Sequence, residues 1–174
     1  NFVVRKGIKL TLMGPNGAGK STLFSLIMGE RHCEEGRVII GQGLSVALAK
    51  QFISHTQWGL TVREFLELAF TEKVYDIDKR AQSVFATVEL NVPLDKTIKD
   101  LSGGQKGRLL IAQALIQEPD ILLLDEPTNN LDKAGIQLLT DFMKSYEKTV
   151  IVISHDASFL NAFTHGVIYM NTQT

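Results

Sequence analysis

Residues 14–22 read Gly-Pro-Asn-Gly-Ala-Gly-Lys-Ser-Thr, so closely spaced glycines precede a lysine and two hydroxyl side chains. Glycines let the backbone curl until successive N–H groups point inward and form a nest for an anion. Lys20 would reach the β- and γ-phosphates of a nucleotide, and the Ser21 hydroxyl would complete a Mg²⁺ shell. A glycine-rich turn without a ligand would need neither group, so the loop predicts that the chain binds a nucleoside triphosphate. The predicted phosphate-binding residues are Asn16, Gly17, Ala18, Gly19, Lys20, Ser21 and Thr22.

Polar residues follow two further apolar segments. Residues 121–124 are followed by Asp125, which would hold Mg²⁺ through water, and by Glu126, which could act as general base on the attacking water. Residues 150–153 precede His155, which could contact the γ-phosphate and hold the water and Glu126 in line. The alternatives are a solvated turn carboxylate for Glu126 and a plain polar cap for His155. Because ligands gather beyond the carboxyl ends of parallel strands, we expect these groups to lie together.

A second anion site is predicted at the start of a later helix. Ser102 is its N-cap and Gln105 stands at the capping-box position, with two glycines between them that expose backbone N–H groups. One chain cannot easily bring this site and the phosphate loop onto the same γ-phosphate. We therefore expect each site to serve a different nucleotide, completed by another subunit or domain. The motif comprises Leu101, Ser102, Gly103, Gly104 and Gln105.

Apolar segments predict the strands of the fold. They are residues 8–13, 121–124, 150–153 and 167–170. Residues 37–40 and 45–49 flank a glycine-containing turn and predict a hairpin. Because the all-apolar segments suit strands covered on both faces, and because strands alternate with helices, we expect an α/β three-layer sandwich with a mainly parallel sheet. A mononucleotide-binding domain normally needs more sheet ahead of its phosphate loop, so we also expect the N-terminal part of the domain to be truncated.

Helix signals lie between these strands. Thr61 and Glu64 form a capping box, residues 77–88 carry apolar side chains at helical spacing, and Asp132 is a good N-cap for a later helix. The first two helices predict a small helical subdomain inserted into a phosphate-loop core. The whole chain, residues 1–174, is then a single nucleotide-binding domain, with its core at 1–50 and 101–174 and its helical subdomain at 51–100.

Composition bounds the remaining possibilities. Of the 174 residues, 44% are hydrophobic and 21% charged, a globular balance, and the net charge of -1 gives no bulk attraction to nucleic acid or acidic membranes. The single cysteine, Cys33, excludes an internal disulfide and suits a reducing compartment. No apolar run approaches the length of a membrane span, and the first residues of the sequence show no signal-peptide h-region. We therefore expect a cytoplasmic location.

The motifs resemble, in this order, those of the ATP-binding-cassette (ABC) ATPase family: the phosphate loop, residues 101–105, residues 122–132 and residues 153–156. The resemblance covers nearly the whole chain. It implies an ATPase with ATP and Mg²⁺ as ligands. It also implies a partner, a second ABC cassette on the same polypeptide or in a homodimer, which closes head-to-tail over two ATP molecules.

The resemblance further implies roles for single residues. Gln51 is similar to the Q-loop glutamine, which senses Mg²⁺ and the γ-phosphate, and residues 101–105 resemble the signature motif that contacts ATP on the opposite cassette. The implied catalytic residues are Glu126, His155 and Gln51. The implied metal ligands are Ser21, Gln51 and, through water, Asp125. The D-loop residues are Asn129, Asn130, Leu131 and Asp132.

Within the family, the run Asp-Glu-Pro-Thr-Asn-Asn-Leu-Asp at residues 125–132 is most similar to the ABC-F subfamily. Those are soluble tandem-cassette proteins, many of which act on ribosomes in translation. The alternative is the nucleotide-binding subunit of a membrane transporter, which would dock a membrane-spanning subunit near Gln51 and the helical subdomain. A binding module with vestigial hydrolysis is a third alternative, which the intact Glu126 and His155 argue against.

Overall fold

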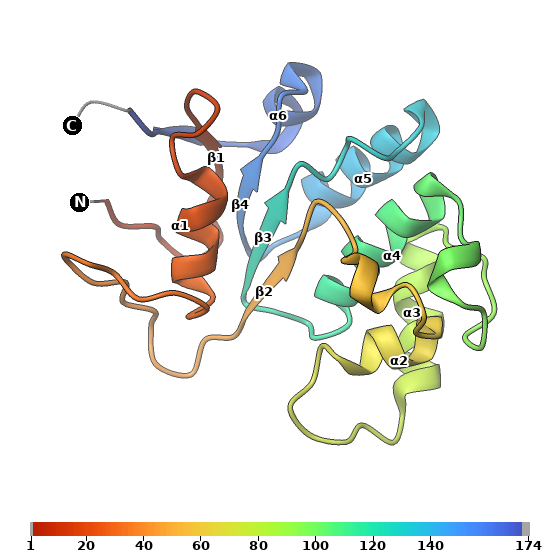
Figure 1. The fold of residues 1–174 in the computed structure, drawn as a ribbon. Helices are drawn as coiled ribbons and strands as arrows, with labels where there is room; N and C mark the ends of the chain where they lie inside the picture. The colour runs from red at the N-terminus through yellow and green to blue at the C-terminus, as the bar shows by residue number, and fades with distance from the viewer. Residues whose placement is uncertain (1, 172–174) are drawn as a thin grey trace.

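The computed structural model describes residues 2–171, and its centre is a five-stranded sheet (Figure 1). The strands are β1 (Lys9–Met13), β2 (Val46–Ala49), β3 (Ile121–Asp125), β4 (Thr149–Ile153) and β5 (Gly166–Tyr169). Their spatial order is β2-β3-β4-β1-β5, and every neighbouring pair is parallel. The carboxyl ends of β1, β3 and β4 therefore lie side by side. The predicted α/β fold with a parallel sheet is confirmed.

Helices cover both faces of this sheet and extend beyond it. They are α1 (Lys20–Ile27), α2 (Val62–Glu67), α3 (Ile77–Val88), α4 (Gly103–Leu115), α5 (Lys133–Ser145) and α6 (Ala157–Phe163), with 3₁₀ turns η1 (His55–Gln57) and η2 (Ile98–Asp100). Helices α2 and α3 pack against each other and against α4. Both fall within the segment predicted as a helical subdomain, and the division of the chain into two subdomains stays a prediction. Among residues 2–171, none of the helices combines the length and apolarity that crossing a bilayer requires.

Two apolar clusters, one on each face of the sheet, make the three layers. Leu123 packs with Leu12 and Phe24 on the face that α1 covers. Leu122 and Leu124 point the opposite way, into the larger cluster that includes buried residues of α4, α5 and α6. Because successive strand residues face opposite sides, a strand buried on both faces must be apolar throughout. This explains the uninterrupted leucines of β3.

Three helix starts predicted from the sequence are confirmed. Thr61 and Glu64 form a capping box at α2, and Ser102 and Gln105 form another at α4. The Asp132 carboxylate accepts a hydrogen bond of 2.9 Å from the backbone N–H of Gly135 and so caps α5. Each cap satisfies N–H groups that the helix itself leaves without a partner. Local polar contacts therefore place these helix starts.

The predicted hairpin is wrong. Residues 37–40, which the structure describes, form no strand, whereas β2 pairs with β3 in parallel register. Ser45 fixes that register, because its backbone and side chain both hydrogen-bond the Asp120 carboxylate and its carbonyl accepts from the N–H of Ile121. A long-range pairing that buries β2 beside the apolar β3 thus replaces the local one. The segment 37–40 remains largely exposed.

Strand β5 forms close to the predicted place but lies at the edge of the sheet. It pairs with β1, and its side chains alternate between half-buried and exposed. Val167 is 58% exposed and Tyr169 is 68% exposed. Unlike β3 and β4, this apolar strand is therefore not covered on both faces.

Candidate active site

A cavity of about 480 Å³ opens at the carboxyl ends of β1, β3 and β4. It brings together residues from the phosphate loop, from the end of β2 and from the ends of β3 and β4. They are Asn16, Gly17, Gly19, Lys20, Ser21, Thr22, Gln51, Asp125, Glu126, Asn129, Ile153 and His155. Of the predicted phosphate-binding residues, Ala18 alone is absent from this lining. The remainder of the predicted D-loop and residues 101–105 lie outside it.

The phosphate loop owes its path to glycine. Gly19, the N-cap of α1, has a φ of 86°, in the left-handed region that only glycine adopts without strain. At Gly14 a Cβ would lie 2.5 Å from the carbonyl oxygen of Met170, so the loop passes too close to the end of β5 for any side chain. The Lys20 ammonium donates to the carbonyls of Gly14 at 2.7 Å and Pro15 at 3.0 Å. A cation is thereby held at the loop, beside the positive end of the α1 dipole.

Oxygen ligands suited to Mg²⁺ lie next to this cation. Burial raises the pKa of the Asp125 carboxyl, and a hydrogen bond from Ser21 together with the charge of Lys20 opposes the rise. A partly desolvated carboxylate beside a hydroxyl fits Mg²⁺, which takes one or two protein oxygens and otherwise keeps water and phosphate oxygens. Within residues 2–171 no group of three or more His, Cys, Asp or Glu side chains is placed to hold a metal ion.

Glu126 and His155 form a pair across the ends of β3 and β4. The distance between His155 Nε2 and Glu126 Oε1 is 3.1 Å; the Glu126 side chain is 9% exposed and that of His155 is 70% exposed. Glu126 has a φ of 49°, and its N–H donates to the carbonyl of Ile153 at 2.8 Å. Its Oε2 is buried and accepts no hydrogen bond from the described residues 2–171. Oε1 is thus the carboxylate oxygen that contacts the histidine, and Oε2 is a buried oxygen that accepts no hydrogen bond from the described residues.

Gln51 lines the cavity from the end of β2 and is linked to the predicted D-loop. The Asn130 side-chain amide donates to the Gln51 carbonyl at 3.4 Å. Asn130 also lies against α4, since a Cβ added at Gly107 would come within 3.1 Å of the Asn130 Cβ. The D-loop segment is therefore in contact with both the cavity wall and α4.

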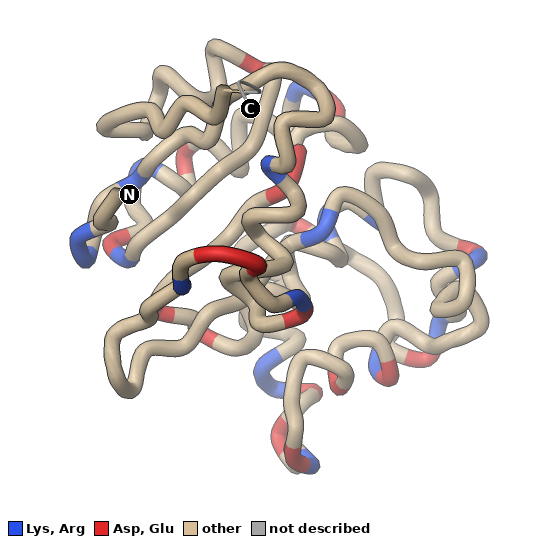
Figure 2. The backbone as a smooth tube through the Cα atoms, turned by 60° about the vertical axis from the view of Figure 1, so that its left-hand side comes forward, with Lys and Arg blue, Asp and Glu red and all other residues tan. Residues whose placement is uncertain are grey.

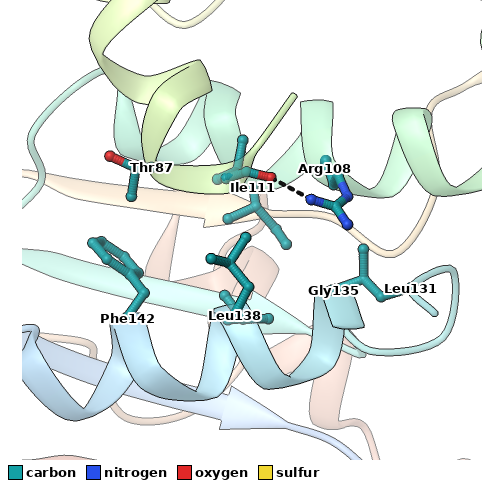
Figure 3. Close-up of a pocket in the computed structure, with 9 residues that line it drawn as sticks. Thr87, Arg108, Ile111, Leu131, Gly135, Leu138 and Phe142 are labelled. Carbon is teal, nitrogen blue, oxygen red and sulfur yellow. Dashed lines mark hydrogen bonds between the residues drawn. The ribbon is translucent and has the colours of Figure 1, made fainter. Parts of the chain in front are cut away.

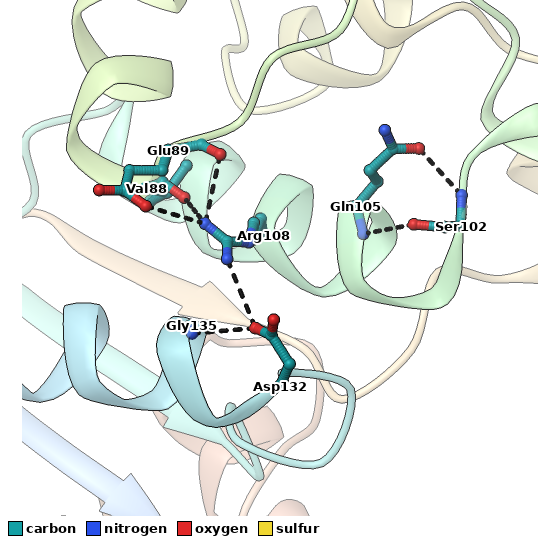
Figure 4. Close-up of polar contacts among 7 residues, drawn as sticks. All are labelled: Val88, Glu89, Ser102, Gln105, Arg108, Asp132 and Gly135. Atoms are coloured by element: carbon teal, nitrogen blue, oxygen red, sulfur yellow. Dashed lines mark hydrogen bonds and ion pairs between the residues drawn. The ribbon is translucent and has the colours of Figure 1, made fainter.

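The start of α4 lies apart from this cavity. Leu101 is buried, whereas Ser102 and Gly103 are exposed. Ser102 N–H donates to Gln105 Oε1 at 3.0 Å, and Gln105 N–H donates to Ser102 Oγ at 3.2 Å (Figure 4). The structure thus does not bring residues 101–105 onto the cavity formed by the phosphate loop of the same chain.

Arg108 is a polar link that sequence reasoning missed. Its guanidinium donates to the carbonyls of Val88 at 2.8 Å and Glu89 at 3.2 Å, and lies 3.6 Å from the Asp132 carboxylate (Figure 4). It therefore ties the end of α3 to the start of α5. Arg108 also stands at one end of a small apolar cavity between the helices, with Ile111 nearby (Figure 3). A single arginine on an amphipathic helix carries no signal of such contacts, because both partners are distant in sequence.

Comparisons with known proteins identify the family of this chain. The family model described as ABC transporter matches residues 1–129. The chain is 37% identical over 162 residues to the ATP-binding protein Uup of Buchnera aphidicola from Acyrthosiphon pisum, covering 91% of the chain and 27% of that protein. It is 35% identical over 167 residues to the zinc import ATP-binding protein ZnuC of the same organism, covering 93% of the chain and 68% of that protein.

A solved structure shows the same fold. The dimeric ATP-binding cassette MJ0796, bound to ADP and Pi, matches with a TM-score of 0.80 and 28% identity, over 98% of this chain and 84% of that one. The chain spans about a quarter of the length of the Uup relative. Since the family model matches well over half of the residues, this chain belongs to the ABC transporter family, as one of its ATP-binding ATPase cassettes.

Proposed function

We propose that this cassette binds ATP with Mg²⁺ in the cavity at the carboxyl ends of β1, β3 and β4 and hydrolyses the bond to the γ-phosphate. The observation that carries the proposal is the Glu126–His155 pair, 3.1 Å apart, in the cavity that the phosphate loop also lines. A carboxylate that lines the cavity and is paired with a histidine suits a general base.

The residues of the cavity divide the work. The N–H groups of residues 16–22 and the Lys20 ammonium hold the phosphates and stabilise the negative charge that develops on them. Ser21 and Asp125 would hold Mg²⁺, which neutralises charge on the phosphate oxygens when bound. Glu126 accepts the proton of the attacking water, and His155 keeps that carboxylate in place. Gln51 contacts the bound nucleotide, and its position changes with the occupancy of the cavity and affects the segments that follow it.

Glu126→Gln tests the base directly. The amide keeps the shape of the side chain but cannot take the proton, so kcat should fall on the order of 10² to 10³, with ATP binding retained. Steady-state ATPase assays and equilibrium nucleotide binding measure the two effects. Glu147→Gln is the matched control, because Glu147 is exposed and precedes β4 at the opposite end of the sheet. Hydrolysis by Glu126→Gln at the wild-type rate would refute the assignment.

We propose that the start of α4 acts on ATP held by a second cassette. Ser102 and Gly103 are exposed and outside their own cavity, yet α4 begins with N–H groups suited to an anion. A head-to-tail pair would place this surface over the partner's phosphate loop. The dimeric state of the MJ0796 structure supports such a pair.

Within the family, we propose an ABC-F protein that acts on ribosomes. The support is the run of residues 125–132 and the likeness to Uup, an ABC-F protein. Figure 2 shows acidic and basic residues interspersed along the backbone, so a ribosome contact would need a local basic patch or another part of the parent protein. The cytoplasmic location expected from the composition remains a prediction.

The second candidate, a transporter subunit, is favoured by the likeness to the zinc import protein ZnuC, of which this chain covers two thirds. An experiment on the parent protein separates the two. The parent carrying Glu126→Gln, with the matching change in any second cassette, should co-sediment with ribosomes in ATP-Mg²⁺ and not in ADP. Recovery in a membrane fraction without ribosome association would favour the transporter instead.

A further inference from the structure

Trp58 is the single tryptophan of the chain and lies in the segment between η1 and α2. The Lys106 ammonium stands over its ring, 4.4 Å from the ring centroid. The His55 ring packs on the same indole, with the ring centroids 4.1 Å apart. An ammonium over an indole face is attracted by the electrons of the ring, so the three side chains form a stack.

The position of Lys106 makes this stack unusual. Its N–H donates to the Ser102 carbonyl at 2.9 Å, which places Lys106 in the first turn of α4. A cation there faces the positive end of the helix dipole, an arrangement that costs free energy by itself. The contact with Trp58 offsets this cost and restrains a side chain that would otherwise be free to swing. The result is a fixed positive charge next to the exposed turn formed by residues 102–105.

The Trp58 segment also contacts the residues that precede that turn. Its carbonyl accepts a hydrogen bond of 3.1 Å from the N–H of Lys99, in η2, and the Leu60 carbonyl accepts one of 2.9 Å from Ile98. Residues 101–105 are thus bracketed, with backbone contacts to the Trp58 segment before them and the Lys106 ammonium on the Trp58 ring after them.

A short connection joins Trp58 to the cavity. The indole Nε1–H donates to the carbonyl of Ile53 at 3.4 Å. Ile53 is buried and lies two residues after Gln51, which lines the cavity. Gln51 and the indole are thus connected by two residues of chain, one of them buried, and one hydrogen bond.

We propose that Trp58 and Lys106 are a pair of positioning residues that set the orientation of the 101–105 turn according to the occupancy at Gln51. The inference rests on the proposed function, in which Gln51 meets the cassette's own ATP and the turn meets the ATP of a second cassette. The pair touches neither nucleotide. The pair sets the position of the 101–105 turn before the second cassette binds.

Fluorescence of this chain tests the pair, because its emission comes from Trp58. ATP-Mg²⁺ should shift the Trp58 emission over the same concentration range in which equilibrium dialysis shows binding. Lys106→Met should alter the emission without nucleotide and diminish the shift, whereas Lys106→Arg, which keeps a cation over the ring, should restore both. Lys79→Met is the matched control: Lys79 is an exposed first-turn lysine of α3 that contacts no aromatic ring among the described residues.

Kinetics provide a second readout. Lys106→Met should lower kcat about tenfold while leaving the KM for ATP within about twofold, since the turn and not the phosphate loop is displaced. Lys106→Arg and Lys79→Met should hydrolyse ATP at the wild-type rate. ATP binding without any change in Trp58 emission, or equal rates for Lys106→Met and Lys79→Met, would overturn the inference and leave the proposed function standing. Absence of ATP binding by the wild-type chain would overturn both.

Discussion

Two helices of this cassette, α1 and α4, have glycines at their N-termini and offer backbone N–H groups to an anion. They differ in how their N-termini are capped. Helix α1 starts after Gly19, and no described side chain caps it. Helix α4 starts after Ser102, and the capping box with Gln105 uses two N–H groups before any ligand arrives. Because unpaired N–H groups at a helix start require a partner, α1 depends on its ligand more than α4 does. The difference suggests that the cavity is built for tight binding, and the 101–105 turn for a contact that forms and breaks.

The largest effect on ATP affinity should come from removing the Lys20 cation at the start of α1, the helix without a side-chain cap. Lys20→Ala leaves the phosphates without a charged donor, and ATP affinity should fall about 100-fold by calorimetric titration. The free energy of unfolding of the nucleotide-free protein should fall by only about 1 kcal/mol, because Lys20→Ala also removes the hydrogen bonds from Lys20 to the loop carbonyls. Lys79→Ala serves as the control. Wild-type affinity for ATP in Lys20→Ala would mean that the loop N–H groups alone carry binding.

A smaller effect is expected at α4, the capped helix, where a substitution should change stability and not ATP affinity. Ser102→Ala removes the acceptor for the Gln105 N–H and should lower the free energy of unfolding by about 1 kcal/mol. The affinity of the chain's own cavity for ATP should stay unchanged, because Ser102 lies outside it. Denaturant unfolding and nucleotide titration measure the two quantities. A loss of ATP affinity as large as that of Lys20→Ala would erase the distinction between the two helices.

The smallest effect concerns the carboxylate beside α1. Burial raises the pKa of Asp125 in the folded protein above its ordinary value of 3.8, so the folded state holds this proton to higher pH than the unfolded chain does. Asp125 therefore destabilises the nucleotide-free protein as pH rises from about 3.8 through the raised pKa, and the penalty persists above it. Asp125→Asn should raise the Tm at pH 7 by about 2 °C while weakening Mg²⁺-dependent hydrolysis.

The pH dependence provides the check. The Tm difference between Asp125→Asn and wild type should vanish below pH 3.8, where the carboxyl is protonated in both states, and should be full at neutral pH. Asp95→Asn, at an exposed position, is the control for the same chemical change. A lower Tm for Asp125→Asn at pH 7 would mean that the hydrogen bond from Ser21 outweighs desolvation.

The features that sequence predicted well are those set by neighbouring residues. Capping boxes at Thr61 and Ser102 and the apolar strand β3 depend on short-range hydrogen bonds and on burial of both faces. The hairpin failed because β2 gains more by pairing with β3, about 75 residues away, than with residues 37–40. The residues around a turn carry no information on which of the two pairings is more stable.

The candidate site divides in the same way. Residue types and strand ends predicted that Lys20, Asp125, Glu126 and His155 gather in one cavity, since parallel strands collect their carboxyl ends at one edge. The contacts of Arg108 and of Trp58 could not be predicted, because each joins segments whose spacing is set by helix packing.

The strand order determines when the cavity can form during synthesis of the chain. Strand β1 carries the phosphate loop near the start of the chain, yet it lies between β4 and β5, which begin at Thr149 and Gly166. During synthesis, β1 and the phosphate loop are therefore made before β4 and β5, the two strands that flank β1 in the sheet. Long-range pairing of this kind is slow and leaves apolar strands exposed meanwhile. An ATP-binding signal should thus appear late on arrested nascent chains, only after β4 has left the exit tunnel.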